Sequence, residues 1–386
     1  MFTRFLSLAL FASWAQAATI AVPTPDTVIA PIASPPAMAA SSYLLVDGAT
    51  GQVLAESNAQ QPLEPASLTK LMTAYLAEKE LKAGNISMDD MVPISVKAWK
   101  TEGSRMFVRE GTQVRLEDLL RGIIIQSGND ASVAMAEYLA GTEEAFAELM
   151  TAQAQALGMQ QTQFYNATGL PADGHLTSAR DLAILARQII YAHPELYKIY
   201  SEKEFTYNDI TQQNRNRLLW RDPSVDGLKT GHTNAAGYCL VASAERNGMR
   251  LISVVMGTDS ASARERETSK LLNYGYRFFE GVTLFTANQD INQPLRVWGG
   301  EADTVAIGPA QDIYRALPKG ARDRLELNLE ATPDLSAPIE KGQTLGTLTL
   351  SLDGEQLTQV PVVALEAVAD GGLVKRAMDW VLKAME

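Results

Sequence analysis

Residues 65–70 read PASLTK and open the first long helical segment of the chain, expected over residues 68–81. Residues three apart share one face of a helix, so the hydroxyl of Ser67 and the amine of Lys70 are expected to meet. A serine hydroxyl is a weak nucleophile until a neighbouring group takes its proton. A lysine amine can do so only when neutral, a form that burial or a second positive charge favours. The spacing therefore predicts an activated serine.

Two further strings follow in order along the chain. Residues 127–129 read SGN and lie between an apolar run and a helix, and residues 229–231 read KTG before an apolar strand. Read singly, Ser67 could be a helix cap, Asn129 a turn residue and Lys229 a solvated charge. An S-x-x-K pattern occurs about once by chance in such a chain, but the ordered set of three strings indicates a serine acyl-transfer site. Lys229 would supply the second positive charge if its strand lies against the helix.

The carbonyl that a serine attacks develops negative charge on its oxygen, and this charge needs preorganised N–H donors. The backbone N–H of Ser67, near a helix N-terminus, is one candidate donor. An N–H on an edge strand just after Gly231 is the other. Gly231 suits this place because a residue without a side chain lets a substrate backbone approach closely.

Composition narrows the possible functions. The chain has 386 residues and a net charge of −12, and an acidic surface argues against binding to nucleic acid. The single cysteine, Cys239, excludes an internal disulfide or a multi-cysteine metal centre. The three histidines have no metal-site spacing. Neither a metal nor another cofactor is expected.

Two folded regions are expected between the ends of the chain. Residues 41–281 begin and end with strand patterns and contain helical patterns between them, which predicts an α+β domain around an antiparallel sheet. The Arg246-Asn247-Gly248 turn joins two apolar strands of this domain as a hairpin. Residues 282–370 contain alternating leucines at 325–329 and 348–352 and predict a small all-β domain.

The two ends carry distinct patterns. Residues 1–17 combine a basic start, a short apolar run and an A-x-A site, which is typical of a secretory signal; a buried helix is the alternative. Residues 18–40 contain five prolines and are expected to be an extended tether. Residues 371–386 form an amphipathic helix after two glycines, expected to lie on a membrane surface rather than against the protein's own body.

The strings together resemble those of the D-alanyl-D-alanine carboxypeptidases, the low-molecular-mass penicillin-binding proteins. The resemblance includes PASLTK at 65–70, IQSGND at 125–130, NRN at 214–216 and VDGLKTGHT at 225–233, and it covers nearly the whole mature chain. It implies the transpeptidase fold that penicillin-binding proteins share with β-lactamases, followed by a β-rich domain and a terminal amphipathic anchor. It also implies a peripheral protein on the periplasmic face of the bacterial inner membrane.

The resemblance implies a set of catalytic roles. Ser67 would form an acyl-enzyme with the penultimate D-alanine of a peptidoglycan stem and expel the last D-alanine, and water would then release the shortened peptide. Lys70 would be the base and Ser127 a proton relay, while Asn129 would bind the substrate amide. β-Lactam antibiotics would acylate the same serine, because their ring mimics the dipeptide.

It also implies a set of binding roles. Lys229 would add positive potential, and Thr230 with Arg264 would hold the terminal carboxylate, which accepts two parallel bonds from a guanidinium. Arg266 lies two residues further on and competes for this assignment. The backbone N–H of His232 would be the second oxyanion donor, so the His232 side chain need not take part.

Three alternatives remain open. A class A β-lactamase also needs a glutamate that activates water, and residues 166–180 contain none. A serine endopeptidase or transpeptidase of the same superfamily would lack, or not use, the β-rich domain and the terminal helix. A non-catalytic cell-wall-binding protein on this fold would not need the reactive residues, all of which are present.

Overall fold

The computed structural model describes residues 18–20 and 33–385. The expected secretory signal at 1–17 lies outside the described residues, as do positions 21–32 of the expected tether. The chain divides into a first unit, Ile32–Phe279, and a second unit that holds Glu280–Glu386 and the N-terminal residues up to Pro31.

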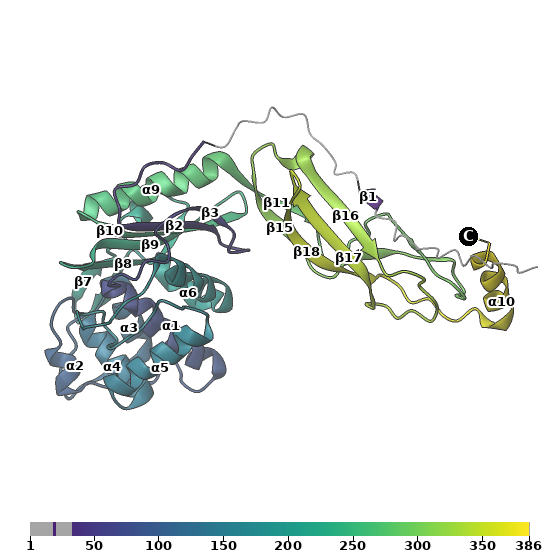
Figure 1. Cartoon of the computed structure of the whole chain (residues 1–386). Helices are drawn as coiled ribbons and strands as arrows, with labels where there is room; N and C mark the ends of the chain where they lie inside the picture. The colour runs from purple at the N-terminus through teal and green to yellow at the C-terminus, as the bar shows by residue number, and fades with distance from the viewer. Residues whose placement is uncertain (1–17, 21–32, 386) are drawn as a thin grey trace, which may run out of the picture. The chain divides into compact units, whose positions relative to one another are not determined.

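The first unit is built on a five-stranded antiparallel sheet in the order β3-β2-β10-β9-β8 (Figure 1). Its strands are β2 (Ser42–Asp47), β3 (Val53–Ser57), β8 (Val225–Thr233), β9 (Gly237–Arg246) and β10 (Met249–Thr258). Strands from the two ends of the unit pair in the middle, since β2 pairs with β10. The hairpin expected around residues 246–248 is the β9–β10 turn. Strand β8, which carries the KTG string, lies at an edge of the sheet.

Helices cover both faces of this sheet, with α9 on one face and the other helices on the opposite one (Figure 1). They include α1 (Lys70–Ala83), α2 (Val96–Lys100), α3 (Leu116–Arg121), α4 (Asn129–Ala140), α5 (Glu143–Ala156), α6 (Ala179–Ala192) and α9 (Ala261–Phe278). Helix α1 is buried on all sides over its first nine residues, so its polar side chains Lys70, Thr73 and Glu78 lie in the interior. A helix of this kind is the centre of a core rather than a surface element.

Three local details differ from the expected elements. Residues Ala66–Thr69 form a 3₁₀ turn, η1, ahead of α1, and Gly122–Gln126 form a π-helical turn, η2, whose C-cap is Ser127. The sequence pattern predicts a closing helix over residues 268–279, but α9 begins at Ala261, because the Ser260 hydroxyl caps it by accepting from the Ala263 N–H. Arg264 therefore lies in the first turn of α9, not before the helix.

The expectation of a tether over residues 18–40 needs correction in two places. Residues Ala18–Ile20 form strand β1, which pairs with β16 of the second unit. Residues 33–40 lie along α9, where side chains of that helix bond to their backbone: Tyr274 donates to the Ala33 carbonyl and Lys270 to the Ala37 carbonyl. Proline-rich chain leaves its carbonyls without local partners, so long side chains of a neighbouring helix can fix it.

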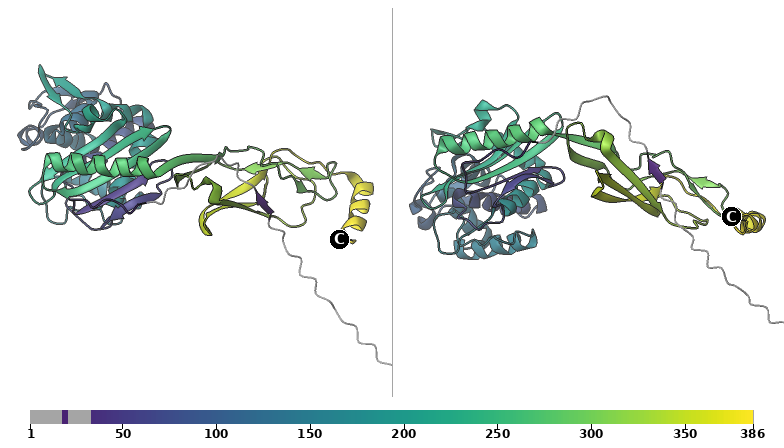
Figure 2. Two further views of the ribbon diagram at one scale, coloured as in Figure 1. Left: turned by 90° about the horizontal axis from the view of Figure 1, so that it is seen from above. Right: turned by 45° about the horizontal axis from the view of Figure 1, so that its top comes forward.

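The second unit is mainly β-structure, as expected. Its larger sheet has the order β1-β16-β17-β18-β14, with β14 (Ile307–Pro309), β16 (Leu325–Ala331), β17 (Thr344–Leu352) and β18 (Glu355–Ala364). Leu325, Leu327 and Leu329 are buried, while Glu326 and Glu330 are exposed, so the alternation reports a half-buried strand. The long β17–β18 hairpin is visible in Figure 2.

The last described element is helix α10 (Gly372–Lys383) of the second unit. Asp379 is buried and accepts a hydrogen bond from the Gly299 N–H at 2.6 Å, which ties the polar face of the helix to the unit. Apolar side chains face outward, with Leu373 85% and Trp380 73% exposed. Within residues 18–20 and 33–385, no helix combines the length and apolar character needed to cross a membrane.

Candidate active site

A cavity of about 460 Å³ in the first unit brings the three strings together. Six of the residues singled out from the sequence line it: Ser67, Ser127, Thr230, Gly231, His232 and Arg264. Lys70, Asn129 and Lys229 are buried next to it. The lining also includes Arg215 and Arg217 but no aspartate or glutamate, so the cavity of this acidic protein suits an anionic ligand.

Residues 65–69, here called the nucleophile turn after the role expected of Ser67, lead directly into α1. Ala66 has a left-handed backbone with φ of +48°, an unusual conformation for a residue with a side chain. Ser67 follows in η1 and is half-buried, and its backbone N–H belongs to a first turn whose N–H groups have no partner within the helix. Lys70 Nζ lies 3.1 Å from Ser67 Oγ, as the i, i+3 spacing predicts.

The Lys70 amine is 1% exposed and has two other partners, Asn129 Oδ1 and the Thr168 carbonyl, each at 2.6 Å. A neutral amine has two N–H groups and one lone pair. The two oxygens can only accept, so they take both N–H groups, and the lone pair is left for the Ser67 hydroxyl. In its neutral form, Lys70 would thus point its lone pair at the Ser67 hydroxyl.

The pKa of Lys70 is lowered to about 7, first by burial and then by the positive charge of Arg215, while Asp130 and Glu143 act in the opposite direction. The sequence suggested Lys229 as the second positive charge. Arg215 supplies this charge instead. Burial and the nearby Lys70 hold the pKa of Lys229 well below its usual value. The Lys229 amine donates only to the Thr230 carbonyl, at 3.1 Å, among the described residues.

The SGN string contributes a free hydroxyl and a fixed amide. Ser127 has a left-handed backbone with φ of +66°, and its buried Oγ has no hydrogen-bond partner in the described part of the chain. Asn129 accepts from Lys70 through Oδ1 and donates through Nδ2 to the Glu102 carbonyl at 2.6 Å. Asn129 therefore holds Lys70 here, a contact that the sequence analysis did not include.

The KTG strand comes close to the nucleophile turn. A Cβ atom at Gly231 would lie 2.9 Å from the Pro65 carbonyl oxygen, so only glycine allows β8 to approach this closely. Arg264 donates from Nη1 to the Gly231 carbonyl at 3.3 Å, and its Nε is buried without a partner among the described residues. Arg266 points elsewhere and pairs with Glu267. The geometry thus favours Arg264 as the carboxylate ligand.

The loop of residues 166–170 packs beneath the nucleophile turn, and the sequence did not mark it as part of the site. Its Thr168 carbonyl binds Lys70, and at Gly169 a Cβ atom would lie only 1.8 Å from the Ala66 carbonyl oxygen. Its backbone contact with a lysine 98 positions away leaves no pattern in the sequence.

His175 fixes the same loop. Its Nδ1 accepts from the Tyr165 N–H at 3.3 Å, so Nε2 carries the proton and donates to Thr69 Oγ1 at 2.9 Å. The pKa of His175 is lowered to about 4 by burial and by Lys70, which keeps the ring neutral. A single histidine far from the three strings gave no sign of this role.

Comparison with known proteins finds similarity over both units of the chain. Residues 29–260 match the family model described as D-alanyl-D-alanine carboxypeptidase, and residues 279–370 match that of the C-terminal domain of penicillin-binding protein 5. The D-alanyl-D-alanine carboxypeptidase DacC of Escherichia coli K12 is 44% identical over 90% of this chain and 88% of its own length.

Two solved structures are also similar. Penicillin-binding protein 5 of Haemophilus influenzae has a TM-score of 0.80 and 42% identity, covering 88% of this chain and all of that one. Penicillin-binding protein D2 of Listeria monocytogenes, solved in an ampicillin-bound form, has a TM-score of 0.57 and 31% identity, covering 62% of this chain and 98% of that one.

Proposed function

The chain belongs to the D-alanyl-D-alanine carboxypeptidase family, serine hydrolases that remove the terminal D-alanine from peptidoglycan peptides, and we propose that its nucleophile is Ser67 with Lys70 as the base. The observation that carries this assignment is the buried Lys70 amine, 3.1 Å from Ser67 Oγ, with both of its N–H groups engaged by other oxygens.

In the acylation step, Ser67 Oγ attacks the carbonyl carbon of the penultimate D-alanine while its proton passes to Lys70. The bond to the last D-alanine then breaks, and the departing amine takes up a proton. The unpartnered Ser127 hydroxyl supports a role as the relay from Lys70 to this amine. The backbone N–H groups of Ser67 and His232 would stabilise the oxyanion.

The substrate would be held by its charge and by its backbone. Thr230 and Arg264 would bind the terminal carboxylate. Lys229 would add positive potential once the bound carboxylate favours its charged form, because its pKa is otherwise held well below the usual value. Asn129 keeps one N–H for the substrate amide, because its Nδ2 has a single partner among the described residues. The free amide edge of β8 at Gly231 suits a peptide that lies along the strand.

In the second step, water adds to the acyl-enzyme ester, the Ser67 oxygen regains its proton, and the shortened peptide leaves with a new carboxylate. A β-lactam ring would open on the same serine and remain attached as an ester. The ampicillin-bound relative supports this expectation for the family.

The two ends of the chain support the proposed location of the protein. The signal-like pattern of residues 1–17 supports export to the periplasm, and the outward-facing apolar side chains of α10 support peripheral attachment to the inner membrane. The order of segments proposed from the sequence is a signal at 1–17, a tether at 18–40, a peptidase domain at 41–281, a β-rich domain at 282–370 and the anchor at 371–386.

Mass spectrometry of the intact protein after exposure to benzylpenicillin tests the nucleophile. The wild-type protein should gain one adduct, located by peptide mapping at Ser67, and Ser67→Ala should gain none. Ser104→Ala is a matched control, because Ser104 lines the same cavity and has no hydrogen bond to a lysine within the described residues.

A parallel assay measures release of D-alanine from a peptide that ends in D-Ala-D-Ala. We expect release by the wild type and a loss of at least about 10³-fold in Ser67→Ala. An adduct that persists in Ser67→Ala would place the nucleophile elsewhere, and wild-type protein that releases no D-alanine above the no-enzyme background would contradict the activity.

A further inference from the structure

The loop of residues 166–170 supports the catalytic lysine from below. Its Thr168 carbonyl takes one of the two N–H groups of a neutral Lys70 at 2.6 Å, so the position of this oxygen sets where the lone pair points. The Ala167 carbonyl also accepts from Thr73 Oγ1 at 2.7 Å, one turn further along α1. The loop is therefore fixed against the helix that carries Lys70.

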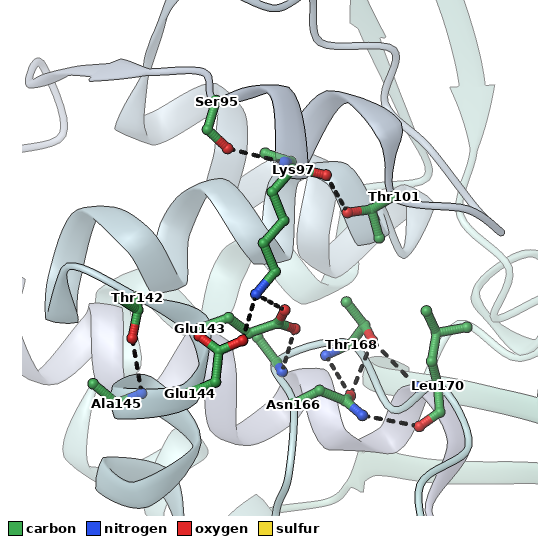
Figure 3. Close-up of polar contacts among 12 residues, drawn as sticks. Ser95, Lys97, Thr101, Thr142, Glu143, Glu144, Ala145, Asn166, Thr168 and Leu170 are labelled. Atoms are coloured by element: carbon green, nitrogen blue, oxygen red, sulfur yellow. Dashed lines mark hydrogen bonds and ion pairs between the residues drawn. The ribbon is translucent and has the colours of Figure 1, made fainter.

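The side chain of Asn166 organises this loop. Its Oδ1 accepts from the Gly169 N–H at 2.7 Å, from the Thr168 N–H at 3.1 Å and from Thr168 Oγ1 at 3.0 Å. Its Nδ2 donates to the Leu170 carbonyl at 3.0 Å (Figure 3). An asparagine that bonds to the backbone following it forms a tight turn. Four bonds from one side chain thus hold the peptide units on both sides of the Thr168 carbonyl.

A second support comes from α5. Glu143 Oε1 accepts from the Ala167 N–H at 3.1 Å, and Glu143 Oε2 pairs with Lys97 of α2 at 3.0 Å. Figure 3 shows the Lys97 amine between the carboxylates of Glu143 and Glu144. Glu144 is more exposed and makes no hydrogen bond to the loop in the described part of the chain, so the ion pair reaches residues 166–170 through Glu143.

We propose that Asn166, with Glu143 behind it, is a positioning residue for the general base: it holds the Thr168 carbonyl where it takes an N–H of Lys70 and so aims the Lys70 lone pair at Ser67. This inference rests on the proposed roles of Ser67 and Lys70. Catalytic groups displaced by about 1 Å lose about 100-fold in rate, so the four bonds of one uncharged side chain matter to the chemistry.

The test compares Asn166→Ala with Asn166→Asp by the second-order rate constant of acylation with benzylpenicillin. Asn166→Ala loses all four bonds and should acylate about 10- to 100-fold more slowly. With a D-Ala-D-Ala peptide its kcat should fall much more than its KM rises. Asn166→Asp keeps the three acceptor bonds and should retain most of the rate at high pH.

The pH profile separates positioning from a merely structural role. The charged groups that act on Lys70 are Arg215, which lowers its pKa, and Asp130 and Glu143, which raise it. The Glu143 carboxylate raises the pKa of Lys70, so Glu143→Gln should move the acid limb of acylation to lower pH, and Asn166→Asp should move it to higher pH. Glu144→Gln removes the other partner of Lys97 and should leave the profile unchanged.

Two results would overturn the inference. One is a folded Asn166→Ala whose acylation rate lies within about twofold of wild type. The other is the same pH profile for Glu143→Gln and Glu144→Gln, which remains decisive if Asn166→Ala does not fold. Either result with normal Ser67 labelling of the wild type leaves the proposed function intact, whereas an unlabelled wild type counts against the proposed function itself.

Discussion

At the scale of single residues, the chemistry depends on the state of one amine. Lys70 loses its water on burial, and Arg215 adds a positive charge nearby, so its pKa falls to about 7. A charged lysine would donate three hydrogen bonds and have no lone pair for the Ser67 proton. The three hydrogen-bond partners of Lys70, which are Ser67, Asn129 and Thr168, therefore orient it as a base only when its amine is neutral.

Acylation should consequently follow the titration of Lys70. The rate constant with benzylpenicillin should rise about tenfold per pH unit below pH 7 and level off above it, because only the neutral amine accepts the proton. Stopped-flow or quench measurements between pH 5 and 9 would show the midpoint. Removing the charge of Arg215 in Arg215→Gln should raise the Lys70 pKa and move the midpoint to higher pH.

The permanently charged variant Lys70→Arg is the complement, and it should acylate too slowly to measure at any of these pH values. A wild-type rate that does not change between pH 5.5 and 8 would mean that Lys70 is not the titrating base.

At the scale of elements, the sequence predicts those strands, caps and side-chain contacts that depend on local patterns. The alternation at Leu325, Leu327 and Leu329 predicts β16. The sequence also offers Thr177 or Ser178 as a helix cap, and Ser178 caps α6 by accepting from the Asp181 N–H. The i, i+3 spacing predicts the Ser67–Lys70 contact. Each of these signals lies within one turn or one strand.

What the sequence did not indicate depends on contacts between distant segments. The Thr168 carbonyl and the charge of Arg215 reach Lys70 from loops about a hundred residues away or more, and a backbone carbonyl has no residue type to mark it. The early start of α9 was missed because its first turn, Ala-Ser-Ala-Arg, has no apolar side chain larger than alanine and Ser260 is its main signal. The strings therefore predict residues that the fold brings to one cavity, whereas the contacts that support Lys70 leave no local pattern in the sequence.

Helix α1 carries a second buried ionisable group that catalysis does not use. Glu78 lies in the interior, where Tyr200 donates to its Oε1 at 3.0 Å, and its Oε2 has no partner within the described residues. Burial raises the pKa of Glu78 from 4.5 to about 8. The folded protein therefore keeps this proton over a pH range in which the unfolded chain releases it.

This difference predicts the sign of a stability effect. Between pH 4.5 and 8 the unfolded state loses the Glu78 proton and the folded state does not, so stability falls as pH rises and the loss is complete above pH 8. Glu78→Gln removes the titration and should stabilise the protein at pH 8 by about 2–4 kcal/mol, measured by urea unfolding.

At pH 4 the same substitution should have little effect, because the carboxyl is protonated in both states. Glu80→Gln on the outer part of α1 is the matched control and should change stability little at either pH. A Glu78→Gln protein that is less stable than wild type at pH 8 would show that the carboxyl is ionised when folded.

At the scale of the whole molecule, the proposed catalytic groups and the proposed attachment belong to different units. All nine proposed site residues lie within Ile32–Phe279, whereas α10 belongs to the second unit. The positive side chains of α10 are paired within that unit: Lys375 with Asp303 and Asp379, Arg376 with Asp370, and Lys383 with Asp334. Attraction to anionic lipid is therefore weak, and apolar insertion has to supply the binding.

A protein without residues 372–386 should stay in the supernatant when mixed with zwitterionic phosphatidylcholine vesicles, while wild-type protein sediments with them. The double variant Leu373→Ser/Trp380→Ser should behave like the truncation, because both side chains are exposed and their loss leaves the Asp379 contact in place. Leu149→Ser, an exposed leucine on α5, is the control and should still sediment.

All variants should release D-alanine from a soluble peptide within about twofold of wild type, since α10 contributes no group to the site. A truncated protein that still sediments would show that another segment attaches the protein to the membrane.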